Sequence, residues 1–501
     1  MRAPLIAVAI VACAALCADP RGAAAEWQPA GLRPAATTLA EVLATNAKAA
    51  GTPQAAFADR RERWTYTNGS RVLPVDVAVK GDDFRATVAV GSALYDAGRL
   101  HGVRWRGDAN GIVHGLFADQ QGDALDRLPQ SLFPFDPKRC ELAGETVGPN
   151  PAWVIVDRPS GEPPSWFFVD EASGLIVREE TREGQRVFGT TFDRFAPVAG
   201  VERPRHWHIS DGDPHNDLDV AVETIAPGPV PAAAVSLPLE QHVFAPAAGP
   251  LGIVELPAEF RQGRVSVAVV VGGRREHFIL DSGTASITLD AGDARRFDPL
   301  LEHAIVPRMS VGSLEMGDVS VLAIPTGVGI LGYDFFFGHV VRIDYLHERV
   351  EVLSHEAAAS VFADPNTVVL PANVDYGLPL VHVTLGRLAS GAFAVDTGSP
   401  DLFAFGPFAR RNAAEIAAHW SAAGRNHVVN YLEGSVYISP RRVSEFDLGP
   451  FRFKNADVGV EIPNTMADAL AIPFDGIIGT NVLRSFDLYF DYDHGRIGLR
   501  R

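Results

Sequence analysis

Two short motifs in the C-terminal half of the chain each place an aspartate before a hydroxyl residue and a glycine. Asp281 opens the first motif, Asp-Ser-Gly-Thr, and Asp396 opens the second, Asp-Thr-Gly-Ser. Two carboxylates within hydrogen-bond reach cannot both ionise cheaply, so such a pair shares one proton. The ionised member can take a proton from water while the protonated member polarises a carbonyl group. We therefore take Asp281 and Asp396 as the candidate catalytic pair, for a hydrolysis that needs no metal and no cofactor.

Both motifs belong to a duplicated pattern. In each copy an apolar run leads into the aspartate, and a hydrophobic-hydrophobic-Gly triplet and a strand-like segment with Asp-Tyr follow. Asp344 lies 12 positions after Gly332 in the first copy, and Asp491 lies 12 positions after Gly479 in the second. One isolated Asp-Ser-Gly-Thr would be weak evidence, because these residues are common in turns. Two instances in register within a repeat favour a shared function.

This pattern resembles the aspartic peptidases, specifically the retropepsin-like branch of the pepsin/retropepsin clan, over residues 251–501. The resemblance implies an aspartic endopeptidase that acts on a peptide or protein. It implies two β-barrel lobes in one chain, which meet as a pseudo-dimer around one active site, so that a monomer suffices for activity. It also implies that Gly283 and Gly398 bring backbone donors close to the carboxylates, where a bulkier residue would obstruct the site.

The same resemblance implies roles for the hydroxyl residues of the two motifs. Ser282 and Thr397 are expected to cross-link the two loops through hydrogen bonds of their hydroxyl groups. Thr284 and Ser399 are expected to steady the outer oxygens of the two carboxylates. Which of the two aspartates holds the proton is left open by the sequence.

The second copy is longer between its motifs than the first. Asp396 and Gly479 are 83 positions apart, against 51 positions in the first copy, and the excess ends in a β-hairpin signal with Gly434 at its tip. We predict that this hairpin is a flap that covers the substrate, with Tyr431 or Tyr437 capping the site, and that the first lobe has no flap. An ordinary surface hairpin is the alternative.

An N-terminal domain is predicted over residues 26–225. Thr38 and Glu41 form a capping-box signal for a short helix that Gly51 would end. Beyond it, apolar residues alternate with polar ones between turn signals, which is typical of a meandering antiparallel sheet. The region resembles the half-barrel of periplasmic lipoprotein-carrier proteins, which implies a lipid or apolar ligand. A domain that only shields or docks the C-terminal lobes is the alternative, and we favour it slightly.

The start of the chain carries the signals of an exported protein. Arg2, an apolar run and Ala23-x-Ala25 predict a signal peptide, so the protein is expected to be periplasmic or secreted. A lipoprotein anchored through Cys13 is the less favoured alternative. The predicted segments are a signal peptide (1–25), an N-terminal antiparallel β domain (26–225), a proline-rich linker (226–250), protease lobe 1 (251–362) and protease lobe 2 (363–501).

Composition excludes several other functions. The formal net charge of −17 and the lack of a Lys/Arg cluster argue against nucleic acid as a partner. No apolar run after the signal peptide is long enough for a transmembrane span. Cys140 would be alone in the mature chain, which excludes an intramolecular disulfide. His206 and His208 could suggest a metal, but a polar turn explains them better. Rival functions are an envelope lipid- or peptide-binding protein with a vestigial protease unit, or a structural envelope protein.

Overall fold

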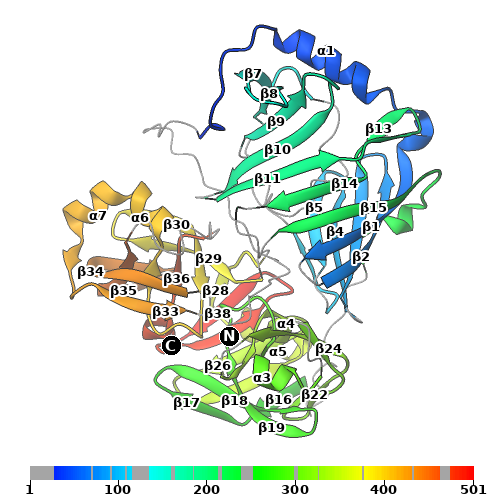
Figure 1. The fold of residues 1–501 in the computed structure, drawn as a ribbon. Coiled ribbons are helices and arrows are strands. Elements are labelled where there is room, and N and C mark those ends of the chain that lie inside the picture. The colour runs from blue at the N-terminus through cyan, green and yellow to red at the C-terminus, as the bar shows by residue number, and fades with distance from the viewer. Residues whose placement is uncertain are drawn as a thin grey trace. The chain divides into compact units, whose positions relative to one another are not determined.

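The computed structural model divides the chain into two compact units (Figure 1). The described residues are 27–68, 71–90, 93–107, 110–115, 135–158, 164–183, 186–210, 212, 217–238, 252–297, 303–324, 327–374, 377–431, 434–462 and 474–501. The predicted signal peptide and Cys13 lie outside them. The N-terminal unit is Met1–Asp108 with Gly115–Pro238, and the C-terminal unit is Ala109–His114 with Leu239–Arg501. No helix among the described residues is both long and apolar enough to cross a membrane.

One antiparallel sheet dominates the N-terminal unit. Its described strands run in the order β6-β5-β4-β3-β2-β1-β15-β14-β11-β10-β9-β8-β7, so most neighbours in space are also neighbours in sequence. This confirms the expected mainly β fold with an N-terminal antiparallel sheet. The strands are β1 (Asp59–Asn68), β2 (Arg71–Lys80), β3 (Asp83–Val90), β4 (Ala93–Leu100), β5 (Val103–Gly107), β6 (Val113–Gly115), β7 (Cys140–Glu145), β8 (Ala152–Asp157), β9 (Ser165–Asp170), β10 (Ile176–Glu183), β11 (Arg186–Asp193), β14 (His206–Ser210) and β15 (Leu218–Pro227). A separate two-stranded sheet joins β12 (Ala196–Val198) to β13 (Val201–Arg203).

Helix α1 (Leu39–Ala50) begins and ends where the sequence predicts. The Thr38 hydroxyl accepts a hydrogen bond from the backbone N–H of Glu41 at 3.3 Å, and the Glu41 carboxylate accepts one from the Thr38 N–H at 2.9 Å. Gly51 ends the helix with a φ of 84°. A Cβ atom at Gly51 would lie 2.2 Å from the carbonyl oxygen of Gly200, so glycine is required there. The capping-box prediction is confirmed.

Three sheets build the C-terminal unit in the described part of the chain. One contains β17 (Ala258–Arg261), β18 (Arg264–Val271), β19 (Arg274–Leu280), β20 (Thr288–Asp290), β21 (His303–Val306), β22 (Met309–Val311), β23 (Leu314–Met316), β24 (Val319–Ile324) and β25 (Gly329–Leu331). Another contains β29 (Leu380–Leu385), β30 (Leu388–Val395), β31 (Phe403–Ala404), β32 (Ser421–Ala422), β33 (His427–Tyr431), β34 (Gly434–Leu448), β35 (Phe451–Glu461) and β36 (Gly476–Ile478). The third runs in the order β16 (Ile253–Leu256), β27 (Arg349–Leu353), β26 (Val340–Asp344), β37 (Asp487–Asp491), β38 (Arg496–Arg500) and β28 (Val368–Pro371).

The sequence repeat is also a repeat of strand pairing. In the first copy β19 lies parallel to β25, with Leu280 opposite Leu331, and in the second β30 lies parallel to β36, with Val395 opposite Ile478. Each copy then ends in an antiparallel hairpin, β26–β27 or β37–β38. Because β26 pairs antiparallel with β37, the two hairpins form the middle of the third sheet. This sheet joins the two copies.

Short helices connect the strands of the C-terminal unit. They are α3 (Ala291–Ala294), α4 (Tyr333–Phe336), α5 (His355–Ala363), α6 (Gly406–Arg411), α7 (Ala413–His419) and α9 (Thr480–Leu483). A large apolar cluster takes buried side chains from both copies of the repeat, including Phe278 and Leu280 from the first and Phe393 and Val395 from the second. The strands that lead into the two aspartates are therefore anchored in one common core.

Two features differ from the sequence-based organisation. Strand β15 and the short helix η2 (Ala232–Ala234) extend the N-terminal unit into the predicted linker. Residues 109–114, which the sequence placed inside the N-terminal domain, belong to the C-terminal unit. The side chain of Asn110 donates hydrogen bonds to the Ser320 carbonyl at 3.1 Å and to the Asp334 carboxylate at 3.0 Å, and Ile112 is fully buried.

Candidate active site

Asp281 and Asp396 occupy equivalent places at the ends of two buried strands. Asp281 directly follows β19, and its backbone N–H donates to the carbonyl of Leu331 at 3.1 Å. Asp396 directly follows β30, and its N–H donates to the carbonyl of Ile478 at 3.0 Å. The parallel strand pair thus continues up to each aspartate, which fixes the start of each loop against the core.

Each of the two glycines lies directly against the carboxylate of the opposite loop. Gly283 and Gly398 each donate their backbone N–H to the aspartate of their own loop, at 2.8 Å in both cases. A Cβ atom at Gly283 would lie 2.3 Å from Cγ of Asp396, and one at Gly398 would lie 2.3 Å from Cγ of Asp281. Real side chains do not come that close, so only glycine fits either position. The two aspartates from distant parts of the sequence therefore meet in one site.

Four hydrogen bonds of Ser282 and Thr397 join the two loops. The Thr397 hydroxyl accepts from the Ser282 backbone N–H at 3.0 Å and donates to the carbonyl of Leu280 at 2.8 Å. The Ser282 hydroxyl accepts from the Thr397 N–H at 3.1 Å and donates to the carbonyl of Val395 at 2.7 Å. Both side chains are fully buried. Buried hydrogen bonds are costly to leave unmade, so this cross-link fixes the separation of the two loops.

The residues after the two glycines donate different hydrogen bonds to the two carboxylates. The Thr284 hydroxyl donates to Oδ2 of Asp281 at 2.9 Å. The backbone N–H of Ser399 donates to Oδ1 of Asp396 at 3.0 Å, whereas its hydroxyl donates to the carbonyl of Asp401 at 3.3 Å. Ser399 thus contacts its carboxylate through the main chain, whereas Thr284 uses its hydroxyl group.

Electrostatics also distinguish Asp396. Burial raises the pKa of the Asp396 carboxyl well above its usual range, and the negative charge of Asp281 and a hydrogen bond to that side chain raise it further. The backbone N–H groups of Gly398 and Ser399 act against this rise. Two carboxyl groups in such contact retain a proton between them, so the pair can supply an acid and a base at once.

Two tyrosines next to the pair were missed by the sequence analysis. Burial raises the pKa of the Tyr345 hydroxyl, and the charges of Asp396 and Asp281 add to the effect. Burial also raises the pKa of Tyr492, whose hydroxyl donates to the carbonyl of Ser282 at 3.5 Å. Both phenols are therefore neutral near the aspartates. The signal was present, because both copies of the repeat contain Asp-Tyr at the same place.

The predicted flap region forms a hairpin of β33 and β34. Tyr431 pairs with Gly434, so Gly434 begins β34, and the two-residue turn itself lies outside the described residues. Val429 packs against an apolar cluster that contains Phe403 and Ile477. Tyr437 is 56% exposed, and strand alternation places it on the face opposite Val429, because it is paired with Val428.

The aspartates Asp344 and Asp491 of the repeat, and the histidines His206 and His208, take part in ion pairs. Asp344 accepts from Arg342 at 3.0 Å, and Asp491 accepts from Arg496 at 2.8 Å. His206 Nδ1 lies 2.9 Å from a carboxylate oxygen of Asp193, and His208 Nδ1 lies 3.0 Å from one of Asp219. The strand β14 that carries both histidines lies in the N-terminal sheet, between β11 and β15.

No protein-family model and no curated protein matches the chain. Solved structures show partial likenesses. A LolA superfamily protein from Nitrosomonas europaea is 9% identical with a TM-score of 0.32, over 40% of this chain and 98% of that one. An aspartic proteinase from Irpex lacteus is 13% identical with a TM-score of 0.31, over 50% of this chain and 97% of that one. A retropepsin-like aspartic protease from Rickettsia conorii is 17% identical with a TM-score of 0.19, over 26% of this chain and 89% of that one.

Proposed function

We propose that the C-terminal unit is an aspartic-type endopeptidase, which hydrolyses peptide bonds with a water molecule activated between Asp281 and Asp396. One observation carries the proposal: the glycine of each loop lies so close to the opposite carboxylate that no Cβ atom fits. A fold that only needed the two loops for packing would have no reason to bring two carboxyl groups together, because their mutual repulsion is costly. Such a pair is useful when one member must be acid and the other base.

The raised pKa of Asp396 assigns the two roles in this proposal. Asp396 holds the shared proton, and Asp281, which accepts hydrogen bonds from Gly283 and Thr284, acts as the base. Asp281 takes a proton from the water as the water oxygen bonds to the peptide carbonyl carbon. Asp396 gives its proton to the carbonyl oxygen. The proton on Asp281 then passes to the amine nitrogen as the carbon–nitrogen bond breaks, and Asp396 regains its proton from the collapsing diol.

The β33–β34 hairpin is the flap in this proposal. Its Val429 face packs on Phe403 and Ile477, and Ile477 lies on β36, the strand paired with the one that leads into Asp396. The hairpin therefore reaches the segment beside the catalytic pair. A strand edge at this place could hold an extended peptide through main-chain hydrogen bonds and exclude water from the site.

The test is cleavage of a peptide library between about pH 3 and pH 8, the range over which carboxyl groups and their partners act as acids and bases. The native protein, Asp281→Asn and Asp396→Asn are compared, with Asp457→Asn as a matched control, because Asp457 is an exposed aspartate in the same unit. We expect cleavage by the native protein and the control and none by the other two. Cleavage that survives either change, or its absence from well-folded native protein, would refute the proposal.

A further inference from the structure

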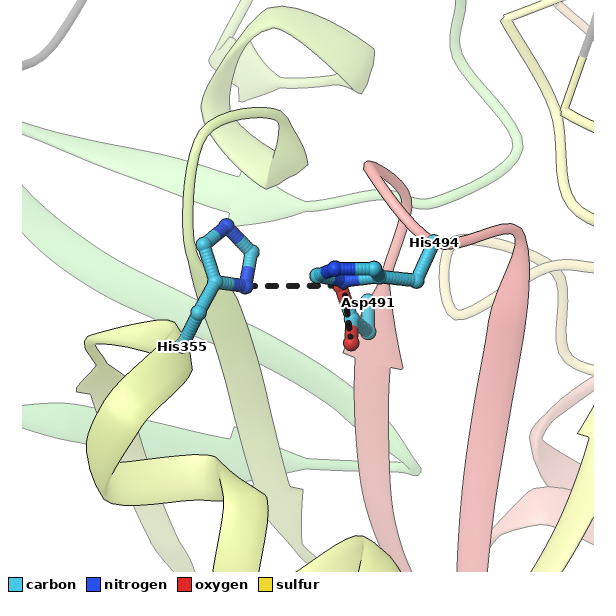
Figure 2. A group of neighbouring side chains, drawn as sticks. All are labelled: His355, Asp491 and His494. Atoms are coloured by element: carbon cyan, nitrogen blue, oxygen red, sulfur yellow. Dashed lines mark hydrogen bonds and ion pairs between the residues drawn. The ribbon is translucent and has the colours of Figure 1, made fainter.

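Three side chains from two distant segments, none of them in the loops of Asp281 and Asp396, converge in the C-terminal unit (Figure 2). His355 is the first residue of α5, Asp491 is the last residue of β37, and His494 lies in the turn before β38. One ligand-type atom from each residue lies within 4.8 Å of the other two. The Asp491 side chain is fully buried, whereas the two imidazole rings reach the surface. The buried carboxylate of Asp491 therefore lies beside two imidazole rings that are in contact with solvent.

Both oxygens of the Asp491 carboxylate have close partners. Oδ2 accepts a hydrogen bond from Nε of Arg496 at 2.8 Å, which balances the charge of the carboxylate, and it also lies 3.0 Å from Nδ1 of His494. Oδ1 lies 2.8 Å from Nδ1 of His494 and 3.5 Å from Nδ1 of His355. The two histidines therefore approach the same oxygen with the same kind of ring nitrogen.

A neighbouring carboxylate sets the orientation of the His355 ring. Nε2 of His355 lies 3.0 Å from Oδ2 of Asp493, an oxygen that also accepts the backbone N–H of Gly338 at 2.9 Å. In the neutral ring the Nε2–H donates to Asp493, so Nδ1 carries the lone pair. Metal-binding histidines are held in this way by a carboxylate behind the ring.

The Nδ1 atom of His355 has no hydrogen-bond partner in the described part of the chain, although it is buried. In the neutral ring its lone pair faces Oδ1 of Asp491, another acceptor. Two buried acceptors that face each other are unfavourable unless a cation lies between them. This arrangement is a second indication of a ligand, independent of the clustering of the three residues.

We propose that His355 Nδ1, His494 Nδ1 and Asp491 Oδ1 bind a divalent transition metal ion of the zinc class. Two imidazoles and one carboxylate suit zinc, cobalt, nickel or copper, with water as a further ligand. Tetrahedral ligands at about 2.1 Å from zinc are about 3.4 Å apart. The two contacts with Asp491, 2.8 Å and 3.5 Å, lie on either side of this value, and all three ligand atoms lie within 4.8 Å of one another. The ion would tie α5, which follows the first repeat, to the final hairpin of the second.

The first repeat provides a matched site that lacks the second imidazole. Asp344 corresponds to Asp491, and His347 Nδ1 lies 2.9 Å from its Oδ2, as His494 lies beside Asp491. Arg342 donates to that same oxygen at 3.0 Å, so a cation already occupies this position. His347→Ala is therefore the control for His494→Ala, because it removes an equivalent ring from an equivalent turn.

The experiment is titration of the metal-free full chain, without a histidine tag, with Co²⁺ followed by visible absorption and with Zn²⁺ followed by calorimetry. We expect binding that is weakened at least tenfold by His355→Ala and by His494→Ala, and left unchanged by His347→Ala. Asp493→Asn is expected to weaken binding by about 10- to 100-fold, as loss of an orienting partner does. Zn²⁺ should raise the melting temperature of the native chain and of His347→Ala only.

Both histidines are partly exposed, so their alanine variants are expected to fold, and far-UV circular dichroism checks this. Absence of Co²⁺ and Zn²⁺ binding by the native chain would overturn the proposal, as would binding that persists in the His355→Ala, His494→Ala double variant. The metal titration is read out by absorption, heat and melting temperature, so its outcome is independent of whether the chain cleaves peptides.

Discussion

At the scale of single residues, two glycines determine how close the carboxylates come. The backbone conformation at Gly283 and Gly398 does not require glycine, since neither residue has a positive φ. Glycine is required there because the carboxylate of the opposite loop fills the place of each Cβ atom. The contact is reciprocal, so either substitution would push the same two loops apart.

We predict that Gly283→Ala and Gly398→Ala each lower the rate of peptide cleavage by about 100-fold or more, because a displacement near 1 Å has such effects on reacting groups. Gly317→Ala is the matched control, since no atom lies within 4 Å of its Cβ position. Rates measured under single-turnover conditions test this. Equal rates for all three variants would show that the close approach has no role in catalysis.

The raised pKa of Asp396 predicts how stability depends on pH. A carboxyl group whose pKa is higher in the folded than in the unfolded chain makes the folded state bind more protons between the two values. Stability therefore falls as pH rises from about 3.8, the ordinary value, towards the folded pKa. Asparagine has no ionisable side chain, so the Asp396→Asn variant does not lose folding stability in this way as the pH rises.

Calorimetry of the native chain and Asp396→Asn between about pH 3 and pH 7 measures this effect. We expect the variant to gain melting temperature relative to the native chain as the pH rises, in the transition of the C-terminal unit. A difference that is the same at every pH would contradict the assignment of the proton to Asp396. The transition that responds also identifies the C-terminal unit in the calorimetric trace.

The sequence could indicate the pair because each motif is local, but it could not indicate the differences within the pair. Thr284 and Ser399 occupy the same place in the repeat, yet only Thr284 donates its hydroxyl to a carboxylate. The Ser399 hydroxyl instead donates a hydrogen bond to the carbonyl of Asp401. Such choices depend on which acceptors the tertiary fold brings near, and a motif does not contain that information.

At the scale of elements, the β33–β34 hairpin carries one tyrosine in each strand. Tyr437 is paired with Val428, so strand alternation places it on the face opposite Val429, the residue that packs against the cluster of Phe403 and Ile477. We predict that Tyr431→Ala lowers kcat/KM by about tenfold or more if the hairpin closes over substrate, because closure excludes water and positions the peptide. Tyr437→Ala is the matched control and should leave kcat/KM nearly unchanged. The opposite order of effects would rule out this orientation of the flap.

The elements were predictable to different degrees. The duplicated motifs indicated equivalent strands, and the parallel pairs β19–β25 and β30–β36 have the same register around the two aspartates. The pairing of β26 with β37 was not predicted, because strand patterns show that a segment is extended without showing its partner. The cluster of His355 with Asp491 and His494 was missed for the same reason. Asp491 and His494 belong to the repeat, but His355 begins a helix outside it, and the sequence does not show that this helix start lies beside the final hairpin.

At the scale of the whole molecule, residues 109–114 are a part of the C-terminal unit that comes from the N-terminal half of the sequence. Asn110 bonds Ser320 and Asp334, and the Ser320 N–H donates to the Asn110 side-chain oxygen at 2.8 Å. Ile112 lies in the main apolar cluster. The sequence pattern gave no sign of this, because an asparagine and an isoleucine beside glycines are typical of any loop.

We predict that Ile112→Ala destabilises the C-terminal unit by about 2–5 kcal/mol, the cost of truncating a fully buried isoleucine. Calorimetry should show the loss in the same transition that responds to Asp396→Asn. Val72→Ala, at an apolar residue that is 63% exposed in the N-terminal unit, is the control and should have little effect. A loss confined to the other transition would show that residues 109–114 support the N-terminal unit.

The central claim is that one chain builds one catalytic site from two loops. The most direct measurement is peptide cleavage by Asp281→Asn and Asp396→Asn, assayed separately and as an equimolar mixture over a range of concentrations. We expect no cleavage by either variant or by the mixture, while the rate of the native protein rises in proportion to its concentration. Cleavage restored by mixing would contradict it, because the two intact aspartates would then come from different chains.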